Sequence, residues 1–181
     1  TGAMDTVVMV RVMHHLADVP RALAQIRRVM HRESAAVLEY ANKRNLKALA
    51  RWALRRQSWS PLDTKPVEFV ELNYDSHPAW MWSRLEEANL RVQRQLAVSH
   101  FRAGFLKQAL PAHTLAHLDR RLFAVGGRYP LAPSVFVQAT APEAGASVLA
   151  DSEPADITAL LRCPVCKTDN VLVRHADDQL A

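Results

Sequence analysis

The order of apolar and polar residues near the amino end predicts a strand, a helix and a second strand. Residues 5–13 are almost continuously apolar, as in a strand whose two faces are both covered. Asp18 can cap the following helix and Pro20 suits its first turn. Four apolar residues recur at the spacing of one helical face: Val19, Leu23, Ile26 and Met30. Residues 35–40 form the second strand, and a single connecting helix favours a parallel pair with a right-handed crossover.

The rest of the chain alternates helical and extended patterns. Helices are predicted over residues 45–57, 77–87 and 103–123, the last interrupted at Pro111. Strands are predicted over residues 90–98 and 134–140, with a turn at Gly126-Gly127 between them. Residues 67–73 are mixed and receive no assignment. Residues 141–156 are rich in Ala, Pro, Glu and Ser and are interpreted as a linker before a tail over residues 157–181.

Polar side chains stand where the first two strands end. His14 and His15 follow the first strand, and Asn42 and Lys43 follow the second. In open parallel sheets, ligands bind just outside the carboxyl ends of the strands. We therefore expect a ligand site at this edge of the sheet.

The ordered phrases of the chain resemble the carboxyl-terminal half of class I S-adenosylmethionine-dependent methyltransferases. The resemblance covers residues 5–140, and its phrases are Asp5–Leu16, Ala22–Met30, Ala36–Tyr40, Leu85–Val92 and Ser134–Ala139. It implies an α/β fold in which residues 1–140 form a partial Rossmann-like methyltransferase sheet. The strands would be parallel except for a final antiparallel one, with helices on both faces.

The same resemblance implies S-adenosylmethionine as cofactor. Val10, Arg11 and Val12 would line its cleft. The family's glycine-rich loop and ribose-binding acidic residue precede the strand that matches residues 5–13, and its usual Pro-Gly-Gly turn is replaced here by residues 31–34. We therefore expect a truncated enzyme that binds the cofactor weakly, or a remnant without activity.

The candidate site residues are those at and beyond the carboxyl ends of the predicted strands. His14 and His15 are the candidate catalytic bases, because imidazole titrates near neutral pH; the alternative is that both only pack or cap the turn. The candidate substrate-binding residues are Glu39, Tyr40, Asn42, Lys43 and His77. Their alternative role is hydrogen bonding to neighbouring loops. An aromatic-polar cluster is a candidate lid over a substrate: Asn73, Tyr74, His77, Trp80 and Trp82. The alternative is that Trp80 and Trp82 belong to the core. The methyl acceptor itself cannot be read from these residues.

Charge supports a rival hypothesis. The net charge is +5, and ten basic residues crowd the span from Arg21 to Arg56. If the helix over residues 45–57 begins early, Lys43, Lys47, Arg51 and Arg55 form a basic stripe. Such a stripe is typical of a nucleic-acid-binding or adaptor module without catalysis, although a solvated helix face is the simpler interpretation.

Two cysteines, Cys163 and Cys166, have the spacing of half a zinc site, and their surroundings resemble the start of a zinc-ribbon module. A structural zinc needs four ligands; His175 is a possible third, and Asp177 or Asp178 a poor fourth. The tail over residues 157–181 is therefore interpreted as incomplete, and a tail with two free thiols is the alternative.

No apolar run reaches the ~20 residues of a membrane helix, so we expect a cytoplasmic protein. The oligomeric state cannot be read from the sequence.

Overall fold

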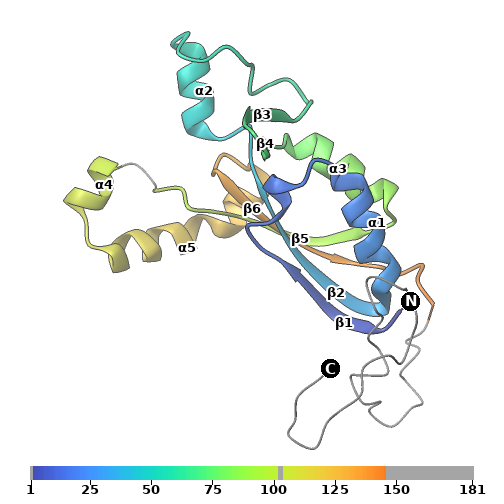
Figure 1. Ribbon diagram of the computed structural model, residues 1–181. Coiled ribbons are helices and arrows are strands. Elements are labelled where there is room, and N and C mark those ends of the chain that lie inside the picture. The colour runs from blue at the N-terminus through green and yellow to red at the C-terminus, as the bar shows by residue number, and fades with distance from the viewer. Residues whose placement is uncertain (1, 102–103, 146–181) are drawn as a thin grey trace, which may run out of the picture.

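The computed structural model describes residues 2–101 and 104–145, and Figure 1 shows their arrangement. Strand β1 spans Met4–Met9, helix α1 spans Val19–Val29 and strand β2 spans Met30–Ala41. β1 and β2 are parallel, with Val7 opposite Ala36 and Met9 opposite Leu38. This confirms the strand–helix–strand unit, although β1 ends before residue 13 and a short 3-10 helix, η1, takes up Met13–His15.

The main sheet has four strands in the order β1-β2-β6-β5. Strand β5 spans Arg91–Val98, and β6 spans Ser134–Thr140. β6 lies between β2 and β5 and is antiparallel to both. The prediction of an α/β fold whose parallel strands are joined by a final antiparallel strand is therefore confirmed.

Helices α1 and α3 pack on the same face of this sheet and on each other; α3 spans Pro78–Glu87. Both begin at a capping side chain: Asp18 accepts a hydrogen bond from the N–H of Arg21, and His77 accepts one from Ala79. The largest core residues between these helices and the sheet are Leu23, Met30, Leu38, Tyr40, Met81, Leu85, Val135 and Val137. Burial of this face fixes the position of the two strand ends that carry the polar residues.

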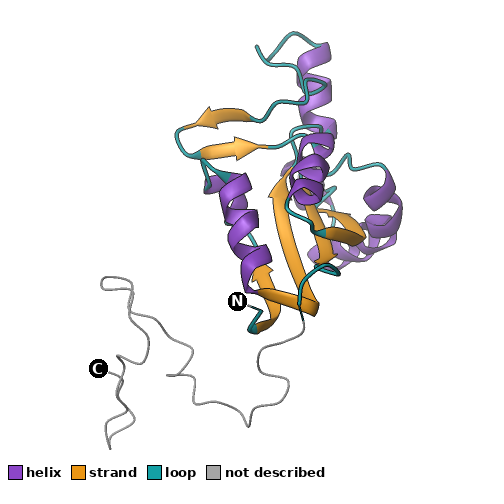
Figure 2. Ribbon diagram, turned by 90° about the vertical axis from the view of Figure 1, so that its right-hand side faces the viewer, coloured by secondary structure: helices purple, strands orange, loops and turns teal. Residues whose placement is uncertain are grey.

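The opposite face of the sheet carries a shallow groove lined by Val37, Leu96, Val98 and Phe136. The resemblance implied helices on both faces. Within the described residues, the helices that cover the sheet, α1 and α3, share one face, and the longest helix packs along edge strand β5 instead. Figure 2 shows the sheet from the side with α1 against it.

That longest helix is α5, Ala112–Arg128, which follows the short helix α4, Gly104–Ala109. The predicted turn at Gly126-Gly127 is wrong, because both glycines lie inside α5. A Cβ on Gly127 would stand 2.1 Å from the backbone oxygen of Gln95, and one on Gly126 would stand 2.8 Å from the His100 ring. The two glycines are therefore present to let α5 approach β5 closely, a contact that the local sequence does not reveal.

A small hairpin stands beyond the carboxyl ends of β1 and β2. Helix α2, Leu46–Ala53, is followed by a loop and then by strands β3, Val67–Val70, and β4, Asn73–Asp75. β4 contacts η1, and Ser76 forms a bridge with Asn42 at the end of β2. The segment that the sequence left unassigned therefore covers the predicted ligand edge.

Residues 31–34, predicted as a break, belong to β2. They form an irregularity, because Met30 pairs with Met4 while Ala35 already pairs with Thr6. His31 is buried there and its ring lies 2.9 Å from the carboxylate of Asp5, which ties the bulge to β1.

No helix among the described residues has the length and apolarity needed to cross a bilayer. Most of the predicted linker, residues 146–156, and the whole tail over residues 157–181 lie outside the described part of the chain.

Candidate functional site

The carboxyl ends of β1 and β2 meet at one buried carboxylate. One oxygen of Glu39, near the end of β2, accepts a hydrogen bond of 2.6 Å from the backbone N–H of Arg11, just after β1. The other oxygen accepts a hydrogen bond from the hydroxyl of Ser134, the first residue of β6. Glu39 is only 9% exposed. One side chain therefore joins the ends of three strand segments into a single rim.

Arg11 takes the left-handed backbone conformation, with φ of 58°. This conformation is costly for a residue with a Cβ, and the hydrogen bond to Glu39 helps to hold it. It turns the chain sharply after β1 and leaves Val10 and Val12 38% and 44% exposed beside the rim. The three residues predicted to line a cofactor cleft are thus presented at the strand end.

The two predicted bases lie next to each other in η1. The rings of His14 and His15 are 4.0 Å apart between centroids. The Nδ1 of His15 lies 2.9 Å from the backbone oxygen of Leu72; because a carbonyl only accepts, Nδ1 carries the hydrogen and Nε2 of the neutral ring is left as the proton acceptor. Burial, followed by the neighbouring His15, lowers the pKa of His14, while Glu39 opposes the shift. The lowered pKa favours the neutral form of the His14 ring.

Two of the predicted substrate-binding residues, Asn42 and Tyr40, have side chains directed into the fold. Asn42 donates from its side-chain nitrogen to the backbone oxygens of Pro130 and Ala132, at 2.7 and 2.8 Å. Its side-chain oxygen accepts from the N–H of Arg44. Tyr40 points into the core, and burial raises the pKa of its hydroxyl. Asn42 therefore forms hydrogen bonds with neighbouring loops, which is the alternative weighed above. Tyr40 packs in the core, and its hydroxyl has no hydrogen-bond partner among the described residues.

Lys43 and His77 are also held by their own chain. Lys43 is 2% exposed, and its Nζ donates to the backbone oxygens of Asp63 and Lys65 at 3.0 and 2.6 Å. Burial lowers the pKa of Lys43, while Asp63 and Asp75 oppose the shift. His77 is buried at the start of α3, and burial is likewise the largest cause of the lowering of its pKa.

The predicted basic stripe does not form. α2 begins at Leu46, so Lys43 precedes it and is buried, and Arg55 follows it in a left-handed conformation. Only Lys47 and Arg51 remain one turn apart on the helix. The two tryptophans of the candidate lid have different surroundings. Trp80 packs against the core, whereas Trp82 is exposed and donates to the side chain of Gln95 at 3.0 Å.

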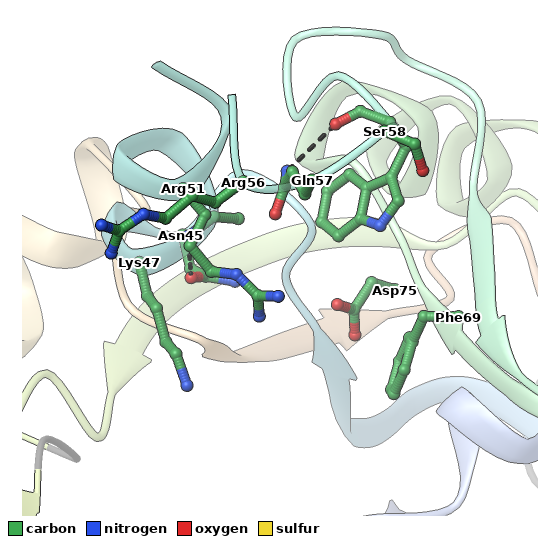
Figure 3. Close-up of a pocket in the computed structure, with 10 residues that line it drawn as sticks. Asn45, Lys47, Arg51, Arg56, Gln57, Ser58, Phe69 and Asp75 are labelled. Atoms are coloured by element: carbon green, nitrogen blue, oxygen red, sulfur yellow. Dashed lines mark hydrogen bonds between the residues drawn. The ribbon is translucent and has the colours of Figure 1, made fainter. Parts of the chain in front are cut away.

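One residue that the sequence gave no reason to select is Asp75, at the end of β4. Burial raises its pKa to about 6, although Lys43 acts in the opposite direction. It lies in a pocket of about 480 Å³ between α2 and the β3–β4 hairpin, with Phe69 beside it and Lys47 and Arg51 across from it (Figure 3). No local pattern marks Asp75, since its burial depends on the packing of a hairpin that the sequence left unassigned.

The predicted metal ligands, Cys163 and Cys166, lie outside the described residues. Within the described part of the chain, no three His, Cys, Asp or Glu side chains come together as a metal site. Zinc binding therefore stays a prediction about the tail.

Comparison with known proteins gives similarity of fold alone. No protein-family model matches the chain, and no curated protein matches it in sequence. A chain from the complex between the Haloferax volcanii Trm112 methyltransferase activator and a protein described as a methyltransferase is 16% identical, with a TM-score of 0.46 over 78% of this chain and 55% of that chain.

Two further structures are similar at the same level. One is a SAM-dependent methyltransferase from Archaeoglobus fulgidus, 15% identical, with a TM-score of 0.40 over 77% of this chain and 60% of that one. The other, from Galdieria sulphuraria, is described as a sarcosine dimethylglycine methyltransferase and is 14% identical, with a TM-score of 0.40 over 77% and 53%. The chain thus spans between 53% and 60% of the length of these structures. Likeness at this level decides nothing about substrate, partner or activity.

Proposed function

We propose that residues 1–140 supply the carboxyl-terminal part of an S-adenosylmethionine-dependent methyltransferase and take part in methyl transfer to an acceptor of unknown identity. The observation that carries the proposal is the rim held by Glu39. It brings the turn after β1, with Arg11, beside the end of β2. Two parallel strands with polar ends at one edge are the arrangement in which α/β folds bind their ligands.

The residues at the rim fit the cofactor chemically. Val10 and Val12 present apolar surface on either side of the turn at Arg11, whose backbone N–H is bonded to Glu39. Such a surface suits a flat, largely apolar ring held partly by peptide groups. When bound, S-adenosylmethionine supplies an electrophilic methyl group.

The two histidines give the rim a proton acceptor. In the tautomer that donates from Nδ1 to Leu72, the Nε2 of His15 is the acceptor nitrogen. The lowered pKa of His14 favours its neutral form. Either ring can take the proton that an acceptor hydroxyl or amine loses, while the rim orients the acceptor, and orientation supplies much of the rate gain in such displacements.

Chemical-shift mapping tests the proposal without requiring activity. The full chain, labelled with ¹⁵N, is titrated with S-adenosylhomocysteine, and backbone and imidazole resonances are followed. We expect weak binding, roughly millimolar. Saturable shifts should centre on the amides of Val10, Arg11 and Val12 and on the rings of His14 and His15.

The exposed His113 on α5 serves as an internal control, since it lies away from the rim. Its resonance should stay unchanged throughout the titration. Saturable shifts that avoid residues 10–15, or shifts equally large at His113, would remove the support for a methyl-donor site at this rim.

The remaining parts of the chain are assigned by the same proposal. Residues 141–156 would link the domain to a tail over residues 157–181, in which Cys163 and Cys166 would belong to a zinc-ribbon-like module. Residues 163–166 have the spacing that supports this.

A further inference from the structure

A second ligand site is built between α2, the loop after it and the β3–β4 hairpin. The pocket there has a volume of about 480 Å³, within the range of small-molecule sites (Figure 3). It differs from the rim described above in its lining, which combines cationic and aromatic side chains: Lys47, Arg51, Arg56, Trp59 and Phe69.

Three cations gather on one side of this pocket. Lys47 and Arg51 are four residues apart on α2 and therefore neighbours on its surface. Arg56 is brought back to the helix because its N–H donates to the backbone oxygen of Arg51 at 2.7 Å. None of the three takes part in an ion pair among the residues that the structure describes. The cationic side thus carries three charges with no ion-pair partner among the described residues, while Asp75 lies across the pocket from them. This excess of positive charge favours an anionic ligand.

Apolar rings and a carboxyl group form the other side. Phe69 on β3 is 52% exposed and lies beside Asp75 of β4, as Figure 3 shows. Trp59 is half-buried, and the Nζ of Lys43 stands 5.9 Å from the centre of its ring, within the range of a cation–π contact. A ligand that fills the pocket would therefore meet aromatic surface and a hydrogen-bond acceptor opposite the three cations.

The two sides together select one ligand chemistry. A simple anion would contact the cations but leave Phe69 and Trp59 without a partner, and an apolar ring alone would leave the cations uncompensated. Guanidinium groups bind phosphate oxygens in pairs, and aromatic side chains stack on bases. We infer that this pocket binds a nucleotide unit, with its phosphate on Lys47, Arg51 and Arg56 and its base against Phe69 and Trp59.

The inference does not depend on methyl transfer, because no residue of the rim enters it. A nucleotide unit can come from a free mononucleotide or from the end of a single-stranded nucleic acid. Both present the same phosphate and the same base, and the experiment distinguishes them.

Isothermal titration of the full chain tests the inference with four probes: adenosine monophosphate, adenosine, inorganic phosphate and an eight-residue oligoribonucleotide. Adenosine monophosphate should bind about tenfold or more tightly than adenosine or phosphate alone, which corresponds to about 1.4 kcal/mol or more. If the oligoribonucleotide binds more tightly still, with a steep fall in affinity as salt rises, the source is nucleic acid. If it binds no better, the source is the free nucleotide.

Variants separate the two halves of the pocket. Arg51→Gln should weaken the binding of adenosine monophosphate and of phosphate, whereas Phe69→Ala should weaken adenosine monophosphate and adenosine and spare phosphate. Arg120→Gln, an exposed cation on α5, is the matched control and should change nothing. Arg51 and Phe69 are both exposed, so neither substitution should disturb the core. Thermal unfolding checks that each of the three variants folds. Binding of adenosine monophosphate no tighter than that of phosphate, or a loss on Arg120→Gln equal to that on Arg51→Gln, would overturn the inference.

Discussion

Replacing Glu39 by glutamine tests the contact that holds the rim together. In the native protein one carboxylate oxygen accepts from the backbone N–H of Arg11 at 2.6 Å, and the other accepts from the hydroxyl of Ser134. Glutamine has nearly the same shape but only one acceptor oxygen. Its oxygen can still accept from the N–H of Arg11, while its amide nitrogen faces the Ser134 hydroxyl, which must then accept instead of donate. Both contacts lose the charge of the carboxylate, and the buried hydroxyl hydrogen of Ser134 loses its acceptor.

The expected loss of stability follows from the change in the hydrogen bonds of this side chain. A hydrogen bond to a charged group contributes about 1.5–3 kcal/mol, and an unpaired buried donor costs a similar amount. Since Glu39 is 9% exposed, water compensates little. We expect the free energy of unfolding to fall by about 2–3 kcal/mol. With a urea dependence of about 1–3 kcal/mol per molar, the midpoint of unfolding should move down by roughly 0.7–3 M.

Urea unfolding followed by circular dichroism measures this change, with Glu33→Gln as the matched control. The Glu33 side chain is 71% exposed, and its one ion pair among the described residues, with Arg32, spans 3.5 Å. An exposed pair of this kind contributes about 0–1 kcal/mol, so the control should stay close to the native midpoint. If Glu39→Gln were as stable as Glu33→Gln, the carboxylate would not join the strand ends, and the account of the rim would be refuted.

Three further variants test other contacts by the same unfolding assay. Gly127→Ala should lose about 1–3 kcal/mol by overpacking against Gln95, whereas Gly104→Ala, with nothing within 4 Å of its Cβ, should be neutral or slightly more stable; equal midpoints for the two would contradict the close contact of α5 with β5. The pKa of Asp75 is raised from 3.8 to about 6, so its contribution to stability is present below pH 3.8 and is lost as the pH rises through 6. Asp75→Asn should therefore stabilise the protein by about 1–3 kcal/mol near neutral pH and change little at acidic pH; an equal effect at both would argue against this burial. Lys43→Met leaves two loop carbonyls unpaired and should cost about 1–3 kcal/mol; an unchanged midpoint, together with unchanged protease resistance of the loop, would show that this lysine does not anchor it.

The sequence predicts those parts of the fold whose signals are local. Helix α1 follows from its apolar spacing and from Asp18, whose side chain accepts the N–H of Arg21 as a cap should. β6 has the predicted bounds, Ser134–Thr140, because its apolar run is short and closed by turns. Asn89 takes the left-handed conformation, with φ of 54°, after α3, as asparagine often does at the end of a helix.

The parts that the sequence does not predict depend on contacts between distant segments. Lys43 is read as an exposed cation, yet the loop after α2 folds back and encloses it with two carbonyls. Gly127 is read as a turn because glycine is common there, while its actual role is set by Gln95, 32 residues away. Asp75 acquires its raised pKa only through the packing of the hairpin.

The candidate site likewise has a part that local sequence signals predict and a part that depends on contacts between distant segments. The polar ends of the two strands do meet, as expected when parallel strands are joined by one helix, and Glu39 joins them. The sequence cannot tell which of the polar residues there stay available. Asn42 is fully used by backbone partners from the chain just before β6, 88 and 90 residues further on, and these partners are unknown until the fold is known.

Photochemical cross-linking is the most direct test of a methyl-donor site at the rim. The full chain is irradiated with S-adenosylmethionine that carries a radioactive methyl group, and the labelled peptides are identified after proteolysis. The account predicts label in the peptide that contains residues 10–15, competed away by excess S-adenosylhomocysteine. Label that falls elsewhere along the chain, or that survives the competitor, would contradict it.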